Sequence, residues 1–193
     1  MQKLIAFFCA IALMTAMMVP AFASGSISGL ETTLVTVATE EKKVESWKIV
    51  IVDTNSVKIS NAAVKEVVDT VNDPQISMTM LEALEKLDNA SLSEEQLAEL
   101  AEYDFVTDFN AIVLKDGRNY YFNINGSAIN AKAQIKIDAL QGETDLSNYL
   151  IMLINPDNGE IAFLELDANA FNAATGEITV EFPFLGVFAL IQK

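Results

Sequence analysis

The side chains that could carry chemistry in this chain are nearly all oxygen donors and acceptors. Its 193 residues include 27 Asp and Glu and no His, and the one cysteine is Cys9. Without imidazole, and with no thiol beyond residue 9, the chain lacks the Ser-His-Asp and Cys-His nucleophiles and the usual ligands of zinc and copper. Carboxylate pairs, Ser-Lys dyads and oxygen-bound Ca²⁺ are the chemistries that remain.

One segment with the residue types of a catalytic site is Asp53-Thr54-Asn55, which follows an apolar run. The Asp-Thr-Gly turn of aspartic proteases has Gly at the third position, and a second lobe or a dimer would have to supply the other aspartate. We therefore interpret this segment as a turn that ends a strand. Two other carboxylates that met in a cleft could still act as a glycosidase pair, so a small secreted carboxylate-dependent hydrolase is the alternative function.

Two turns carry alternating oxygen atoms of the kind that Ca²⁺ prefers. The first contains Asn155, Asp157 and Glu160, and the second contains Asp167 and Asn169. Turns rich in Asn and Asp more often support the local backbone than bind a metal, and no twelve-residue loop fits the EF-hand pattern. We expect no cofactor and no metal site, and Ca²⁺ is the one ion that these turns would suit.

The charge balance excludes two classes of partner. Twelve Lys and Arg against 27 Asp and Glu give a net charge of −15, and the only arginine is Arg118. Such a chain has few means of neutralising phosphates, so we expect neither nucleic acid nor an anionic membrane surface as its partner.

Aromatic platforms for sugars are scarce in this sequence. The only Trp, Trp47, lies in an apparent core strand, and Tyr120-Tyr121 is a doubled aromatic expected on a strand. Because successive side chains of a strand point to opposite faces, we expect Tyr121 at the surface.

Residues 1–23 have the three parts of a secretion signal. Lys3 precedes an uncharged apolar run over residues 4–19, and Pro20-Ala21-Phe22-Ala23 comes before Ser24. The small residues Ala21 and Ala23 predict cleavage before Ser24. The apolar run is shorter than the roughly 20 residues that span a bilayer, which favours a cleaved signal over an anchor. We expect a secreted or extracellular protein, and association with the cell surface is one form that this location could take.

The elements that position the remaining side chains divide into three regions. Residues 24–46 begin rich in Ser and Gly, end in a charged run and contain one candidate edge strand, so we expect a flexible acidic tether. Residues 47–103 are expected to form a subdomain of one buried strand and three short amphipathic helices. The second and third helices open at Thr79 and Ser93 with capping boxes. The residues expected to face inward on the three helices are Val64, Val67, Val68, Val71, Met80, Leu81, Leu84, Leu87, Leu97, Leu100 and Ala101.

Residues 104–193 have the pattern of an antiparallel, sandwich-like sheet. The strands expected there cover residues 111–115, 119–124, 132–140, 149–155, 160–166, 177–182 and 187–192, and the first two flank an Asp116-Gly117 hairpin turn. Residues 149–154 and 187–191 are apolar on both faces, which predicts central strands or strands that the helices cover. The predicted fold class is α+β, with three short helices packed on an antiparallel, immunoglobulin-like β-sandwich region.

The last part of the chain resembles a family. Asn155-Pro156-Asp157-Asn158-Gly159-Glu160, followed by the run from Thr175 to Leu190, resembles the C-terminal immunoglobulin-like β-sandwich of uncharacterised secreted proteins from anaerobic Gram-positive bacteria. The resemblance implies an extracellular β-sandwich module and brings no catalytic residues. Together with the absence of His, it leads us to predict an exported, non-enzymatic binding or cell-envelope-associated module. Its partner would be an unknown protein or glycan of the envelope.

Overall fold

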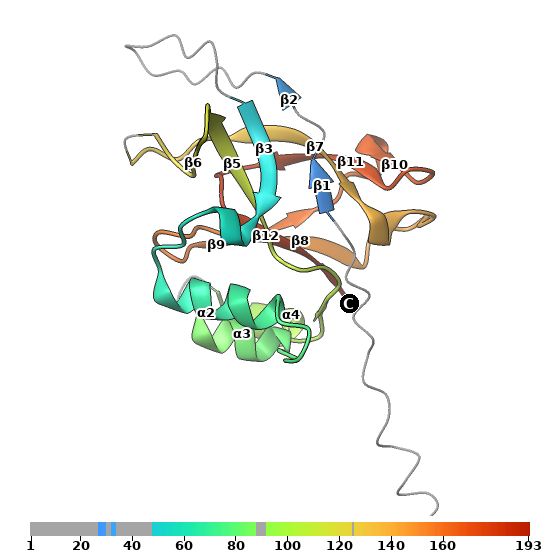
Figure 1. The fold of residues 1–193 in the computed structure, drawn as a ribbon. Helices are drawn as coiled ribbons and strands as arrows, with labels where there is room; N and C mark the ends of the chain where they lie inside the picture. The colour runs from blue at the N-terminus through green and yellow to red at the C-terminus, as the bar shows by residue number, and fades with distance from the viewer. Residues whose placement is uncertain (1–26, 30–31, 34–47, 88–91, 125) are drawn as a thin grey trace, which may run out of the picture.

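The fold has three layers, and each is visible in the computed structural model (Figure 1). The structure describes residues 27–29, 32–33, 48–87, 92–124 and 126–193. Three helices form the first layer, an eight-stranded antiparallel sheet forms the middle layer, and a four-stranded antiparallel sheet forms the third. The predicted α+β class, with three short helices on a sandwich-like pair of sheets, is confirmed. None of the helices described is both long and apolar enough to cross a membrane.

The middle sheet contains the strands that have apolar side chains on both faces. Its order is β2 (Thr32–Thr33), β3 (Lys48–Asp53), β5 (Asn110–Asp116), β12 (Val187–Gln192), β8 (Tyr149–Ile154) and β9 (Ile161–Glu165). Two short strands join it from the side, since β4 (Asp104–Phe105) pairs with β12 and β6 (Asn119–Tyr121) pairs with β5. Both strands predicted to be central, β8 and β12, have a partner on each side, so that prediction is confirmed.

The small sheet has one buried face and one wet face. Its order is β1 (Ile27–Gly29), β7 (Ala131–Ile137), β11 (Glu177–Phe182) and β10 (Phe171–Asn172). Every second residue of β7 and of β11 is buried, as the alternation of their sequences predicts. Three 3₁₀ turns, η1 (Thr54–Ser56), η2 (Asp138–Leu140) and η3 (Ala168–Ala170), complete the connections.

Two hydrophobic cores lie on opposite faces of the middle sheet. Ile151 and Leu153 of β8 pack into the core between the two sheets, together with the buried residues of β7 and β11. Met152 and Ile154 of the same strand pack into the core beneath the helices. A strand that serves two cores needs apolar side chains at every position, which explains the unbroken apolar runs of β8 and β12.

The helices are α2 (Ala62–Val71), α3 (Met80–Lys86) and α4 (Glu94–Leu100). Both predicted capping boxes, Thr79 with Glu82 and Ser93 with Gln96, are present. The expected inward positions are mostly buried, but two predictions are wrong, because Leu81 is 46% exposed and Ala101 is also exposed. Each of these helices is so short that only a narrow stripe faces the sheet, and Leu81 lies one position outside the stripe that starts at Met80.

The predicted region boundaries do not coincide with breaks in the sheets. Strand β3, expected in the 47–103 subdomain, pairs along its whole length with β5 of the 104–193 region. Within the predicted 24–46 tether, β1 pairs with β7 and β2 pairs with β3, so these short segments extend the two sheets. The strand of the first half therefore belongs to the same sheet as the strands of the second half.

Asn72 ties the helical layer to the middle sheet. Its Nδ2 donates to Thr54 Oγ1 at 3.1 Å and to the Phe109 carbonyl oxygen at 3.0 Å, and its Oδ1 accepts from Phe109 N at 2.7 Å. Phe109 is buried, so its backbone groups need partners inside the protein. Asn72 is also the C-cap residue of α2. Its side chain therefore joins the C-terminal end of that helix to the strand that follows Phe109.

Strands β4 and β5 lie along the same side of β12, and the chain between them is not a strand. Thr107 supplies a hydrogen bond to β12 in this gap. Val106 N donates to the Leu190 carbonyl oxygen at 2.9 Å, and the Thr107 hydroxyl accepts from Leu190 N at 2.9 Å. A side-chain oxygen therefore takes the place of the backbone carbonyl that a continuous strand would provide. Thr107 is only 3% exposed, so water does not substitute for this bond.

Two glycines meet steric requirements of the fold. Asp116 pairs with Asn119, so the turn of the β5–β6 hairpin is Gly117-Arg118 and not Asp116-Gly117 as predicted, and Gly117 has a φ of 59°. Gly186 has a different role, because a Cβ there would lie 2.4 Å from the Ile154 carbonyl oxygen. Its missing side chain lets the turn before β12 lie against the end of β8.

The Thr107→Val variant tests the contribution of the Thr107 bond. Valine keeps the shape but leaves the buried Leu190 N–H without an acceptor, so the free energy of unfolding should fall by about 1–3 kcal/mol. Urea denaturation at constant m-value measures this loss. Thr144→Val, at an exposed position, is the matched control and should change little. Equal stability of the two variants would contradict the role assigned to Thr107.

Candidate binding groove

The residues singled out in the sequence lie in separate places. Ala21, Ala23 and Ser24 of the predicted cleavage site fall outside the residues that the structure describes, as does Trp47. Asp53 ends β3 as expected, and its carboxylate accepts from Asn55 N at 2.7 Å. Tyr121 is 38% exposed, in agreement with its predicted surface position.

The oxygen atoms of the two Asn- and Asp-rich turns support the turns themselves. Asn155 Oδ1 accepts from Asp157 N at 3.0 Å, and Asp167 Oδ1 accepts from Asn169 N at 2.8 Å. The carboxylate of Asp157 also accepts from Asn123 Nδ2 at 2.9 Å. Within the described part of the chain, no group of three or more acidic, His or Cys side chains is arranged to hold a metal ion. The expectation of no metal site, with Ca²⁺ as the one ion that these turns would suit, stays a prediction.

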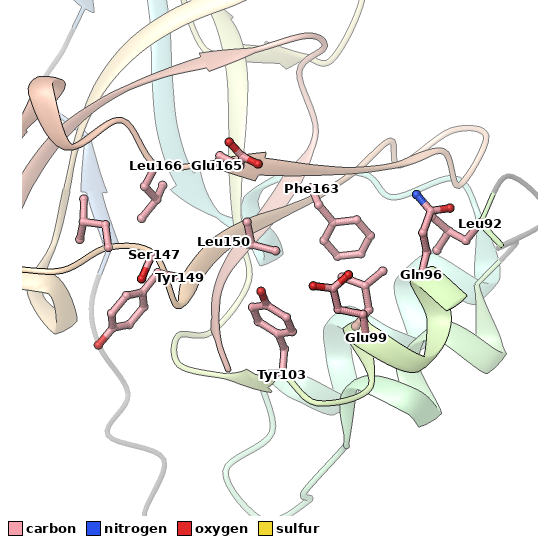
Figure 2. Close-up of a pocket in the computed structure, with 12 residues that line it drawn as sticks. Leu92, Gln96, Glu99, Tyr103, Ser147, Tyr149, Leu150, Phe163, Glu165 and Leu166 are labelled. Carbon is pink, nitrogen blue, oxygen red and sulfur yellow. The ribbon is translucent and has the colours of Figure 1, made fainter. Parts of the chain in front are cut away.

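An open groove of about 610 Å³ lies between α4 and the sheet, where β8 begins and β9 ends (Figure 2). Half of its lining is apolar and consists of Leu92, Leu100, Leu146, Leu150, Phe163 and Leu166. The other half is polar and consists of Gln96, Glu99, Tyr103, Ser147, Tyr149 and Glu165. Apolar surface with a few polar groups around it is the usual lining of a binding site.

The register of β8 and β9 determines which side chains face the helices. Leu150 pairs with Glu165, and Met152 pairs with Phe163. Directly opposed residues share a face, and Met152 lies in the core beneath the helices, so Leu150, Phe163 and Glu165 face the helical side. Phe163 and Leu150 are only half-buried. The sheet thus presents apolar side chains to the groove at a place that α4 does not fully cover.

The opposite wall comes from α4 and the turn after it. Leu100 and Tyr103 are buried and hold this segment against the core, whereas Gln96 and Glu99 are exposed. Gln96 also closes the capping box by accepting from Ser93 N at 2.9 Å, which fixes the first turn of the helix. This wall is therefore firmly placed and polar toward solvent.

The electrostatic character of the groove is negative. Glu99 and Glu165 line it, and none of the lining residues is Lys or Arg. Lys193 lies 6.0 Å from the centre of the Tyr103 ring, but its ammonium is already paired with Glu102 at 2.8 Å. That hydrogen bond and the charges of Glu102 and Glu99 raise the pKa of Lys193. The groove is therefore suited to a neutral or cationic ligand.

Two hydroxyl groups at the β8 end of the groove have internal partners. Burial, followed by the charge of Glu143 and a hydrogen bond to it, raises the pKa of Tyr149. The Ser147 backbone N–H donates to Asp145 Oδ1 at 2.9 Å, and the Ser147 backbone and side chain lower the pKa of Asp145. Both side chains are thus held in place.

Comparison with protein-family models, with curated proteins and with solved structures finds no match to this chain.

No residue of the groove was predicted from the sequence to bind a ligand. Leu100 and the strand at 160–166 were expected, but only as structural elements. One available signal is the edge-forming strand Ile161-Ala162-Phe163-Leu164, which lacks a charge before Glu165. This uncharged strand indicates an open edge only if it is the last strand of the sheet. The order of the strands depends on contacts between distant segments, which the local sequence does not reveal.

The titration of Tyr149 tests the geometry of the groove. Its raised pKa means that the neutral phenol is stabilised in the folded protein, so this stabilisation is complete below the ordinary value of 10.0 and declines at higher pH. In Glu143→Gln the pKa should fall but stay above the ordinary value, because burial remains. Glu99→Gln, on the other wall, should leave it unchanged. Ring ¹³C chemical shifts of tyrosine measure both, and an unchanged pKa in Glu143→Gln would contradict the contact.

Proposed function

We propose that the protein is an exported, non-enzymatic binding module of the cell envelope and that the groove between α4 and β9 is its ligand site. The observation that carries the proposal is a groove of about 610 Å³ whose base is apolar and whose charged lining residues are both acidic. Such a surface can bury apolar parts of a ligand while its carboxylates select neutral or cationic groups. The predicted secretion signal and the absence of His from the chain support the same proposal.

The placement of the two glutamates favours binding. Figure 2 shows Glu165 on β9 and Glu99 on α4, with Leu150 and Phe163 between them. Two carboxylates separated by apolar side chains can hold two parts of one ligand. Hydrolysis of a glycosidic bond needs the two carboxyl groups to face the same bond, about 5–9.5 Å apart.

Carboxylate-dependent hydrolysis is the second candidate, since two glutamates do line one groove. It requires turnover of an envelope glycan by the purified protein and loss of that turnover in both Glu99→Gln and Glu165→Gln. A binding module instead retains the glycan or protein unchanged. Chromatography of the envelope fraction before and after incubation distinguishes the two functions.

A blocking substitution tests the proposed site. Glu99→Trp places a large side chain in the groove and should reduce retention of the full chain on isolated envelope by about tenfold or more. Glu95→Trp, on the same helix and with the same charge change but outside the lining, should bind as the wild type does. Quantitative immunoblotting of bound and free protein measures retention. Equal retention of both variants, or none by the wild type, would contradict the proposal.

A further inference from the structure

The outer edge of β9 is an open strand edge beside the groove. β9 is the last strand of the middle sheet, and within the described part of the chain no strand pairs with its far side. With five residues, it is longer than the described parts of β1, β2 and β10, the other strands that end the two sheets. Its first four residues are uncharged, and it contains neither Lys nor Pro, the usual means of preventing pairing at an edge.

The register identifies the backbone groups that point outward. Asn155 N donates to the Glu160 carbonyl oxygen at 2.8 Å, so this pair is a hydrogen-bonded pair of the ladder. Because such pairs alternate along an antiparallel ladder, Ala162 and Leu164 bond to β8. The N–H and C=O groups of Ile161, Phe163 and Glu165 therefore point away from the sheet. Outside the strand ladders, no backbone hydrogen bond joins these groups to another residue that the structure describes.

The same three residues have their side chains on the helical face. Ile161 and Phe163 pack at the margin of the core beneath the helices, and Glu165 lies on the groove. A strand added antiparallel to β9 would place its residues opposite these three on the same face. The backbone of such a strand would be held by β9, and its alternate side chains would enter the groove.

Charge indicates what kind of strand fits. The residue opposite Glu165 would lie on the acidic groove, where Glu99 is the other charged lining residue and no lining residue is basic. The residues opposite Phe163 and Ile161 would meet apolar side chains. A second copy of this chain is disfavoured, because each copy carries a net charge of −15.

We infer that β9 binds an extended peptide segment of a partner protein by strand addition, with the pattern Lys or Arg, any residue, apolar, any residue, apolar. This inference rests on the proposed function and specifies its ligand. Main-chain hydrogen bonds provide the affinity, and the alternate side chains provide the selectivity. The basic residue of the segment lies opposite Glu165, and the first apolar residue lies opposite Phe163.

A synthetic peptide tests strand addition directly. The probe is acetyl-Thr-Lys-Thr-Val-Thr-Val-Thr-amide, and isothermal titration calorimetry with the full chain measures its affinity. Methylating the two valine amides, which would donate to β9, should weaken binding by about tenfold or more. In the control peptide, the methylated amides belong to the threonine between the two valines and to the threonine after the second valine. These amides point away from β9, so the affinity should change by less than about twofold. The two peptides have the same charge, so they separate strand pairing from general attraction.

Charge reversal tests the register. Glu165→Lys should weaken binding of the probe by about tenfold, and replacing the peptide lysine with glutamate should restore most of the loss. Glu94→Lys changes the net charge equally at an exposed site outside the groove and should have little effect.

Each result decides for or against strand addition. Absence of binding by the unmodified probe, equal effects of the two methylation patterns, or equal effects of Glu165→Lys and Glu94→Lys would overturn it. A dimer joined through β9, detected by sedimentation and lost in Glu165→Pro, would overturn it in favour of a second copy. If strand addition fails while Glu99→Trp still abolishes envelope retention, the proposed function stands and only its ligand class is wrong.

Discussion

The burial of the middle sheet on both faces is the constraint on which the rest of the structure depends. Helices as short as α3 and α4 are marginal in water on their own, and the small sheet has one apolar face that needs a partner. Both layers gain their stability by covering β8 and β12, whose alternate side chains enter two separate cores. Asn72 joins α2 to the middle sheet, and Thr107 joins the segment between β4 and β5 to β12 within that sheet.

The groove follows from incomplete cover at one end of this sheet. The last of the three helices ends at Leu100, and Leu150 and Phe163 remain only half-buried beside it. The neighbouring strand β9 ends the sheet, so apolar side chains and outward backbone groups occur at the same place. The acidic residues around this place determine its selectivity, because they add charge without filling the apolar base.

The local parts of this fold could be predicted from sequence, and the long-range parts could not. The capping boxes at Thr79 and Ser93 and the two-sided strands β8 and β12 leave signals within a few residues. The pairing of β3 with β5, and of β1 with β7, depends on which distant edges meet, and no local pattern encodes that choice. The groove was missed for the same reason, since Glu99 and Glu165 are far apart in the chain. Leu81 is a local error. The helix itself was predicted correctly, but its buried stripe is narrower than predicted and leaves Leu81 exposed.

Amide hydrogen exchange along β9 is the most direct measurement of its open edge, because it reports whether each backbone N–H is hydrogen-bonded. In the free protein we expect the exchange rates to alternate: Ala162 and Leu164 exchange slowly, whereas Ile161, Phe163 and Glu165 exchange fast. Adding the lysine-containing peptide should slow these three amides and leave the other two unchanged. Uniform protection of all five amides in the free protein, or no change at Phe163 when peptide is bound, would contradict it.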